Sequence, residues 1–142
     1  MRLPAARLHT ADARDTAAWW DGNPFDAVLL DAPCTASGIV RRHPDVRWLR
    51  RRSDIAALGR VQAGLLGALW PLVAPGGRLL YATCSIFRAE GVQQIDAFLQ
   101  RVAPGAVRLD PASPGHLLPL ADNAGQGPDE DGFFYALLHK TA

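Results

Sequence analysis

The sequence predicts an α/β fold that contains a parallel pair of strands, and three consecutive segments support this prediction. Residues 27–30 form a short apolar run behind turn residues, as expected for a strand buried in a sheet. Residues 54–72 have the length of a helix and place apolar residues at three- and four-residue steps. Residues 78–83 form a second apolar strand. Because such strands are joined by a right-handed crossover, they should be parallel neighbours.

The remaining elements follow in chain order and depend on more local signals. Residues 6–10 are expected to form a short strand, and residues 14–20 a helical turn whose tryptophans pack on the core. Beyond the second strand of the pair we expect a helix over 90–102, a short strand 107–109, a Pro- and Gly-rich loop 111–131 and a last strand 132–139.

Reactive and polar residues follow both strands of the parallel pair. The first strand runs into Asp31, Pro33 and Cys34, and the second ends at Thr83-Cys84. Pro33 lacks an N–H group and keeps the preceding residue extended, so the chain leaves the strand without starting a helix at once. Since ligands of open α/β sheets bind beyond the carboxyl ends of the strands, Asp31 and the two cysteines are expected to lie at one site.

Several interpretations of the two cysteines compete. A cysteine among small residues is often a buried apolar filler, and a carboxylate after a strand often caps the next turn. Nothing in the sequence indicates the oxidising compartment in which a disulfide would persist. A metal site is not expected, because there is no Cys-x-x-Cys pair and the four histidines are scattered. The remaining interpretation is a nucleophilic thiol with a partner at one active site.

Two of these motifs together resemble a known family. Asp31-Ala32-Pro33-Cys34 followed by Thr83-Cys84-Ser85 resembles the paired-cysteine signature of the RNA (cytosine-5) methyltransferases, and within them the bacterial 16S ribosomal RNA enzymes of the Sun/Fmu type. Residues 38–49 and 131–136 are also similar to that group, so the resemblance covers nearly the whole chain. It implies a Rossmann-like class I methyltransferase sheet, S-adenosylmethionine as cofactor and ribosomal RNA, 16S, as partner.

The resemblance also implies roles for individual residues. Cys84 corresponds to the nucleophile that adds to cytosine C6, and Cys34 to the cysteine that assists removal of the C5 proton and release of the product. Asp31 would hydrogen-bond the base at N3 or N4. Cofactor contacts are implied for Asp12, Asp31 and Pro33. For Asp12 the alternative is a cap on the helical turn that follows it.

Part of the family's pattern is missing from the chain. A class I methyltransferase has a glycine-rich loop after its first strand and an acid after its second, and the sequence contains neither. We therefore expect an incomplete Rossmann-like sheet that lacks the first two strands and the Gly-rich cofactor loop. Residues 1–142 would be the C-terminal portion of an S-adenosylmethionine-dependent methyltransferase domain, and the missing N-terminal part of the same enzyme would be their partner. The strand 27–30 would then expose an apolar edge, and we expect the isolated chain to fold poorly, to bind cofactor weakly and to be inactive.

Positive charge is concentrated in one stretch. Residues 41–52 carry six arginines and one acid, a net charge of +5, whereas the rest of the chain carries −4. Arginine forks match phosphates and stack on bases, and the stretch follows the cysteine loop directly. We therefore predict RNA contacts for Arg41, Arg42, His43 and Arg47. The alternative is a solvated helix face, which is the usual role of a charged run.

Other functions and locations can be compared with this one. A non-catalytic RNA-binding remnant would share the fold and the basic stretch but would transfer no methyl group. A cysteine hydrolase would need a His or Asn placed to activate a thiol, and none is evident. An amino-group methyltransferase would have an aromatic residue where Cys34 stands. No signal peptide and no apolar run of about 20 residues is evident, so a cytoplasmic protein without a membrane segment is expected.

Overall fold

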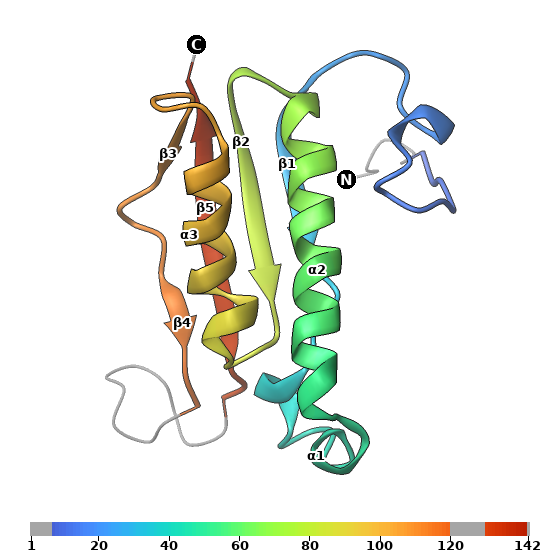
Figure 1. Ribbon diagram of the computed structural model, residues 1–142, viewed down its shortest axis with the longest axis vertical. Coiled ribbons are helices and arrows are strands. Elements are labelled where there is room, and N and C mark those ends of the chain that lie inside the picture. The colour runs from blue at the N-terminus through green and yellow to red at the C-terminus, as the bar shows by residue number, and fades with distance from the viewer. Residues whose placement is uncertain (1–6, 120–129, 142) are drawn as a thin grey trace, which may run out of the picture.

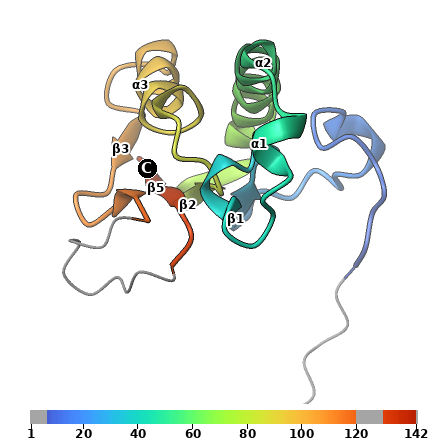
Figure 2. The same cartoon turned by 90° about the horizontal axis from the view of Figure 1, so that it is seen from below.

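Two long helices, α2 (Arg52–Leu69) and α3 (Val92–Arg101), lie against one face of a five-stranded sheet in the computed structural model, which describes residues 7–119 and 130–141 (Figure 1). Figure 2 shows both long helices on the same side of the sheet. The short helix α1 spans Val46–Leu49. The strands are β1 (Phe25–Asp31), β2 (Val73–Thr83), β3 (Val107–Leu109), β4 (Gly115–Leu117) and β5 (Phe133–Lys140).

The strand order confirms the predicted parallel pair. The sheet runs β1-β2-β5-β3, with β4 also paired to β5. β1 and β2 are parallel, and Asp31 pairs with Ala82, so the two strands reach their carboxyl ends together. β5 runs antiparallel to β2, which brings Phe134 beside Thr83 at the same end of the sheet. The loops after β1 and β2 therefore emerge side by side, with the start of β5 next to them.

Alternation of buried and half-exposed residues places the core between the sheet and the helices. On β2, Leu79 and Tyr81 are fully buried, and on β5 Leu138 is as well. α2 contributes Leu66 and α3 contributes Ile95 to the same core. Each apolar side chain of this size stabilises the fold by roughly 1.5 to 3 kcal/mol through burial. This layer holds β2 and β5 rigidly and fixes where their ends lie.

Helix α2 begins two residues earlier than predicted and ends earlier. The Asp54 carboxylate accepts a hydrogen bond from the Arg51 N–H at 2.8 Å, which satisfies one free donor of the first turn. After Leu69 the chain tightens into a 3-10 turn, Trp70–Leu72. By length and composition alone Arg52–Leu72 is long and apolar enough to cross a membrane, whereas the sequence analysis expected no such segment. In the fold, its leucines 65, 66 and 69 are buried in the core against the sheet.

Three local predictions differ from the structure. Residues 7–10 form no strand: they are exposed and pair with no strand of the described sheet, so a weak local pattern had nothing to stabilise it. The predicted loop 111–131 contains the short strand β4, formed because β5 offers it a free edge; residues 120–129 of that loop lie outside the described part. β2 begins at Val73, and the turn at Gly76, with φ of 75°, interrupts its pairing with β1.

β1 lies at the open edge of the sheet, as predicted. Its Leu29 side chain is 68% exposed, although the run that contains it is apolar. Beside this edge is a cavity of about 490 Å³, here called the β1-edge cavity, to which Ala13, Leu29 and Asp31 contribute. The edge therefore presents unpaired backbone groups together with apolar surface, a combination that promotes association.

Candidate active site at the carboxyl ends of β1 and β2

The two cysteines meet beyond the ends of β1 and β2. Their sulfur atoms lie 3.4 Å apart, at hydrogen-bonding distance, and both thiols are free. The loops are joined by their backbones as well, because the Gly38 N–H donates to the Cys84 carbonyl at 2.9 Å. The parallel register of the strands and this bridge hold both sulfurs at a single site, half-buried and reachable from solvent.

The hydrogen bond between the sulfurs makes the two thiols unequal. It lowers the pKa of Cys84 from 9.0 to about 7, because a donor from Cys34 stabilises the thiolate. The same bond, together with burial, raises the pKa of Cys34. We therefore describe the pair as a Cys84 thiolate that accepts the S–H of Cys34. The lowered pKa favours the thiolate form of Cys84, which is the form that acts as a nucleophile.

Glu90 ties the two cysteine loops together from beneath. Its carboxylate is fully buried and accepts hydrogen bonds from both the N–H and the hydroxyl of Thr35, at 2.9 and 2.5 Å. It also accepts from the Ser85 hydroxyl at 2.6 Å and from the Gln62 amide at 3.3 Å. Thr35 follows Cys34 and Ser85 follows Cys84, so one side chain fixes the residue next to each sulfur.

Sequence reasoning missed this role of Glu90, which it treated only as the start of a helix. The carboxylate is buried because its acceptors are matched by donors from three separate elements, and a buried carboxylate without such donors would be costly. A signal was present in the sequence, since hydroxyl residues follow both cysteines. Their shared partner becomes evident only in the fold.

Asp31 and Pro33 lie on the solvent side of the cysteine loop. Asp31 ends β1, is exposed, and contributes its carboxylate to the β1-edge cavity. Its negative charge acts against ionisation of Cys84, although more weakly than the hydrogen bond from Cys34 acts in favour of it. Pro33 is exposed, and its carbonyl accepts from the Gln62 amide at 2.9 Å. Gln62 thus links the backbone of this loop to Glu90.

Asp12 forms a local pair with Arg14. Its carboxylate accepts the Arg14 backbone N–H at 2.9 Å and three guanidinium hydrogen bonds, which lower the pKa of Asp12 to about 2. These contacts are those of a turn cap. The next residue, Ala13, lines the β1-edge cavity with Asp31, whereas Asp12 is not among the residues that line it.

The basic stretch divides into two groups in the fold. Arg41 and Arg42 both face Asp131, whose side chain is only 5% exposed, and Arg42 forms a direct ion pair with it. Arg47, Arg50, Arg51 and Arg52 instead line a separate cavity of about 500 Å³. The His43 side chain is exposed between the two groups. The sequence predicted one basic patch, and the structure separates a pair of half-exposed arginines from a ring of arginines around a cavity.

Comparison with known proteins identifies the family. The model of 16S rRNA methyltransferase RsmB/F matches residues 1–139. The chain belongs to the RsmB/F family. This confirms the resemblance drawn from the two cysteine motifs.

Relatives of the RsmB/F chain agree with this assignment. The chain is 56% identical over 137 residues to ribosomal RNA small subunit methyltransferase B of Xanthomonas campestris, covering 96% of this chain and 31% of the relative. It is 50% identical to the protein of the same name from Pseudomonas putida, covering 96% of this chain and 32% of the relative. The chain thus spans about a third of the length of these curated relatives.

Solved structures confirm the fold of the RsmB/F chain. NSun6 from Pyrococcus horikoshii, crystallised with SFG, superposes with a TM-score of 0.74 at 25% identity, over 96% of this chain and 35% of that protein. A methyltransferase homologue from the same organism gives 0.68 at 28% identity, over 94% and 44%. The predicted fold class, an incomplete Rossmann-like methyltransferase sheet, is confirmed.

Close packing of two glycines joins the C-terminal strand of the RsmB/F chain to the site. The Gly132 N–H donates to the Gly38 carbonyl at 2.7 Å. A Cβ atom at Gly38 would collide with the carbonyl of Gly132, so any larger residue would force the segments apart. The cysteine loop is therefore held from below by Glu90 and from the side by the start of β5. In residues 7–119 and 130–141, no group of three or more His, Cys, Asp or Glu residues could hold a metal ion.

Proposed function

We propose that this chain carries the catalytic cysteines of an RNA (cytosine-5) methyltransferase that uses S-adenosylmethionine and modifies 16S ribosomal RNA in the cytoplasm. The observation that supports this most directly is the 3.4 Å approach of Cys34 and Cys84, with a lowered pKa at Cys84. A lone buried cysteine would have no reason to ionise near neutral pH. Two thiols that share one proton provide both a nucleophile and a second acid-base group.

Cys84 acts as the nucleophile in this proposal. Cytosine C5 is too weak a nucleophile to take a methyl group directly, and addition of a thiolate to C6 turns C5 into an enamine carbon. The new bond joins the Cys84 sulfur to C6, and the electron pair of the C5=C6 bond becomes available at C5. The lowered pKa of Cys84 favours the thiolate that this addition requires at neutral pH.

Cys34 acts after Cys84 has reacted. In the free protein its proton is held by the Cys84 thiolate. Once the Cys84 sulfur is bonded to carbon it is a poor acceptor, so the stabilisation that raised the pKa of Cys34 is reduced. Cys34 can then lose its own proton to solvent, and the resulting thiolate assists removal of the C5 proton by accepting it. Loss of that proton reforms the C5=C6 bond and expels Cys84 as a thiolate.

In this proposal part of the cofactor lies at the Asp31 end of the β1-edge cavity, beside the cysteine loop. The cavity has apolar walls and one carboxylate, Asp31, and Ala13, the residue after Asp12, also lines it. Asp12, Asp31 and Pro33 are the residues of this chain that would hold S-adenosylmethionine, which supplies the methyl group when bound. Asp31 would also accept a hydrogen bond from the base. NSun6 was crystallised with SFG, an analogue of this cofactor.

Residues outside this chain complete the cofactor site in this proposal. Curated relatives are about three times as long, since the chain covers 31% and 32% of two of them. The open edge of β1 and its exposed Leu29 are where further strands would add. The chain alone is then expected to be inactive. In the complete enzyme, its RNA-contacting residues would include Arg41, Arg42, His43 and Arg47. No membrane or metal takes part.

The test is methyl transfer by a chimera in which this chain replaces the matching third of the Xanthomonas campestris relative. We expect tritium from labelled S-adenosylmethionine to enter 16S rRNA at cytosine C5. Cys34→Ala should trap a covalent RNA adduct that survives denaturing electrophoresis, and Cys84→Ala should give neither product nor adduct. An active chimera whose Cys34→Ala variant turns over freely would refute the role of Cys34. No transfer at all by the folded chimera would favour the RNA-binding remnant instead.

A further inference from the structure

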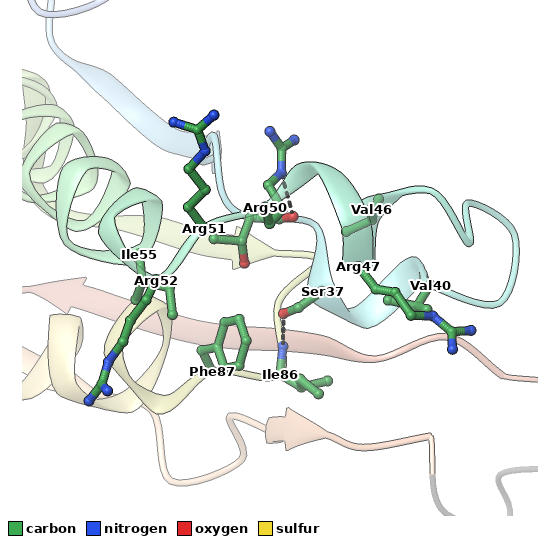
Figure 3. A pocket seen from close by; sticks show the side chains of 11 residues that line it. Ser37, Val40, Val46, Arg47, Arg50, Arg51, Arg52, Ile55, Ile86 and Phe87 are labelled. Atoms are coloured by element: carbon green, nitrogen blue, oxygen red, sulfur yellow. Dashed lines mark hydrogen bonds between the residues drawn. The ribbon is translucent and has the colours of Figure 1, made fainter.

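The cavity ringed by arginines, here called the arginine cavity, lies next to the cysteine loops but does not include the cysteines. Its volume is about 500 Å³, within the range of ordinary ligand sites. Val46 at the start of α1, Ile55 in the first turns of α2 and Phe87 after the Cys84 loop form apolar walls. Figure 3 shows the ring of Phe87 near the centre, with arginine side chains extending outward around it. Thr35, the residue after Cys34, also lines the cavity.

The arginines of this cavity carry charge that the described residues do not neutralise. Ion pairs in residues 7–119 and 130–141 involve Arg14, Arg41, Arg42 and His139, and none involves an arginine of the cavity. Arg50 is partly committed, because its Nε donates to the Thr35 carbonyl at 3.0 Å. Arg47, Arg51 and Arg52 remain available for an anion.

Apolar walls and unneutralised arginines together select the chemistry of the occupant. Arginine forks bind phosphates and stack on flat rings, and an aromatic wall gives a base a surface for stacking. Trp48, between Arg47 and the other arginines in sequence, is 83% exposed and adds a further stacking surface on α1. An acidic peptide would match the charge but would leave the apolar walls unused. A nucleotide matches both.

We propose that the arginine cavity holds the base of an unpaired RNA nucleotide next to the target cytosine, with Arg47, Arg51 and Arg52 on the adjacent phosphates. This rests on the proposed function for the identity of the target. Thr35 connects the two sites: it lines the cavity, follows Cys34, and is fixed by Glu90. A nucleotide seated in the cavity would thus bind one residue away from the catalytic pair, and would hold the strand while the target base leaves its stack.

The first test separates phosphate contacts from general charge. A fluorescein-labelled single-stranded RNA of about twelve nucleotides is titrated with the chimera, and anisotropy is measured across a series of salt concentrations. The double variant Arg51→Gln/Arg52→Gln should flatten the log–log salt slope by about 1.4, since each phosphate contact to a single strand contributes about 0.7. The matched control Arg78→Gln/Arg108→Gln removes the same charge from exposed sites on β2 and β3 and should leave the slope within about 0.3 of wild type.

The second test examines the base. Ile55→Trp should fill the cavity and weaken RNA binding about 5- to 150-fold, the range for one stacked base, while the salt slope stays unchanged. RNAs that carry a single abasic site at successive positions should show one position whose loss weakens wild type but not Ile55→Trp. Near-UV circular dichroism confirms that the variant is folded, and Ile55→Val serves as the small-change control.

Each other outcome counts against the cavity. The proposal would be overturned by equal effects of the two double variants, by the absence of a sensitive abasic position, or by no RNA binding of the wild-type chimera at low salt. It would also be overturned if an acidic peptide bound equally tightly, with the same dependence on Arg51 and Arg52. Methyl transfer is measured separately. Normal transfer with an unchanged KM for RNA in Arg51→Gln/Arg52→Gln would reject the cavity and leave the proposed function intact, whereas cavity-dependent binding without transfer would reject the function and leave the cavity.

Discussion

The loops beyond β1 and β2 differ sharply from the outer edge of β1. In the loops, a fully buried carboxylate, Glu90, has its hydrogen bonds filled by donors from both cysteine loops and from α2. At the edge, Leu29 is 68% exposed, and no strand within residues 7–119 and 130–141 pairs with the outer side of β1. Both regions belong to the same strand. The hydrogen bonds that position the two sulfurs therefore lie within this chain, whereas the outer edge of β1 leaves apolar surface exposed.

Removing the proposed nucleophile, Cys84, should have the largest effect. We expect Cys84→Ala in the chimera to lower methyl transfer by roughly 10⁴-fold or more, because the proposed covalent step is lost and the remaining thiol, Cys34, is proposed to act on the C5 proton and not on C6. Filter-bound tritium in 16S rRNA measures it. Cofactor affinity, measured by calorimetry, should remain within a few-fold of wild type, since Cys84 lies in the loop after β2 and does not line the β1-edge cavity proposed for the cofactor. A variant that retained a tenth of the activity would contradict the covalent mechanism.

Glu90→Ala should have the next largest effect, this time on stability. It removes the acceptor of four buried hydrogen bonds, two from Thr35 and one each from Ser85 and Gln62, at a cost of about 3 to 5 kcal/mol. Urea unfolding of the chimera measures the loss. The matched control is Glu130→Ala, the removal of an exposed glutamate, which should change stability by less than about 0.5 kcal/mol. Equal losses in both variants would mean that the two loops are not held by this carboxylate.

The meeting of the cysteines could be predicted from the sequence, whereas the role of Glu90 could not. Cys34 and Cys84 each follow a short apolar strand, and parallel strands bring their carboxyl ends together whatever the details of packing. Glu90 gains its function from burial, and no local pattern distinguishes a buried carboxylate from a helix-capping one. The pairing of Arg42 with Asp131 likewise joins residues distant in sequence, so the charge run was read as one patch.

The wrong secondary-structure predictions have related causes. Residues 7–10 have a weak strand pattern but no partner strand among the described residues, and a strand without a partner gains no ladder hydrogen bonds. β4 was missed because its three residues lie among glycines and prolines, and it forms only because β5 is beside it. In both cases the presence or absence of a partner strand determines whether a strand forms, and the local sequence gives no information about that partner.

The pH dependence of thiol alkylation sharpens the chemical side of the comparison. With a pKa of about 7, Cys84 should react with iodoacetamide at a rate that is half-maximal near pH 7, while Cys34, whose pKa is raised by its hydrogen bond to Cys84, should react more slowly until Cys84 has been alkylated. Cys34→Ala removes the hydrogen-bond donor, so the Cys84 pKa should rise towards 9.0 and its rate at pH 7 should fall by up to about 50-fold. Mass spectrometry of the modified peptides assigns each rate.

The same shifts have a consequence for stability. Cys84 has a folded pKa below its unfolded value, so its contribution is absent below pH 7 and grows as the pH rises from about 7 to 9. Cys34 has the opposite shift and reduces stability as the unfolded thiol ionises above about pH 9. Stability from the pair should therefore peak near pH 9, and Cys34→Ala should remove that peak. If Cys34→Ala left the pH dependence of Cys84 alkylation unchanged, the two sulfurs would not share a proton.

Leu29→Lys should have the smallest effect on stability and tests the edge itself. Because Leu29 is 68% exposed, the substitution in the isolated chain should change the free energy of unfolding by no more than about 0.5 kcal/mol. It should nevertheless reduce self-association, measured by light scattering after size exclusion, since a lysine on an open strand edge opposes pairing with a second copy. In the chimera the same lysine would lie where further strands are proposed to pack, and should cost about 1 to 3 kcal/mol. Equal effects in both contexts, or micromolar binding of S-adenosylmethionine by the isolated chain, would show that the edge of β1 is already complete.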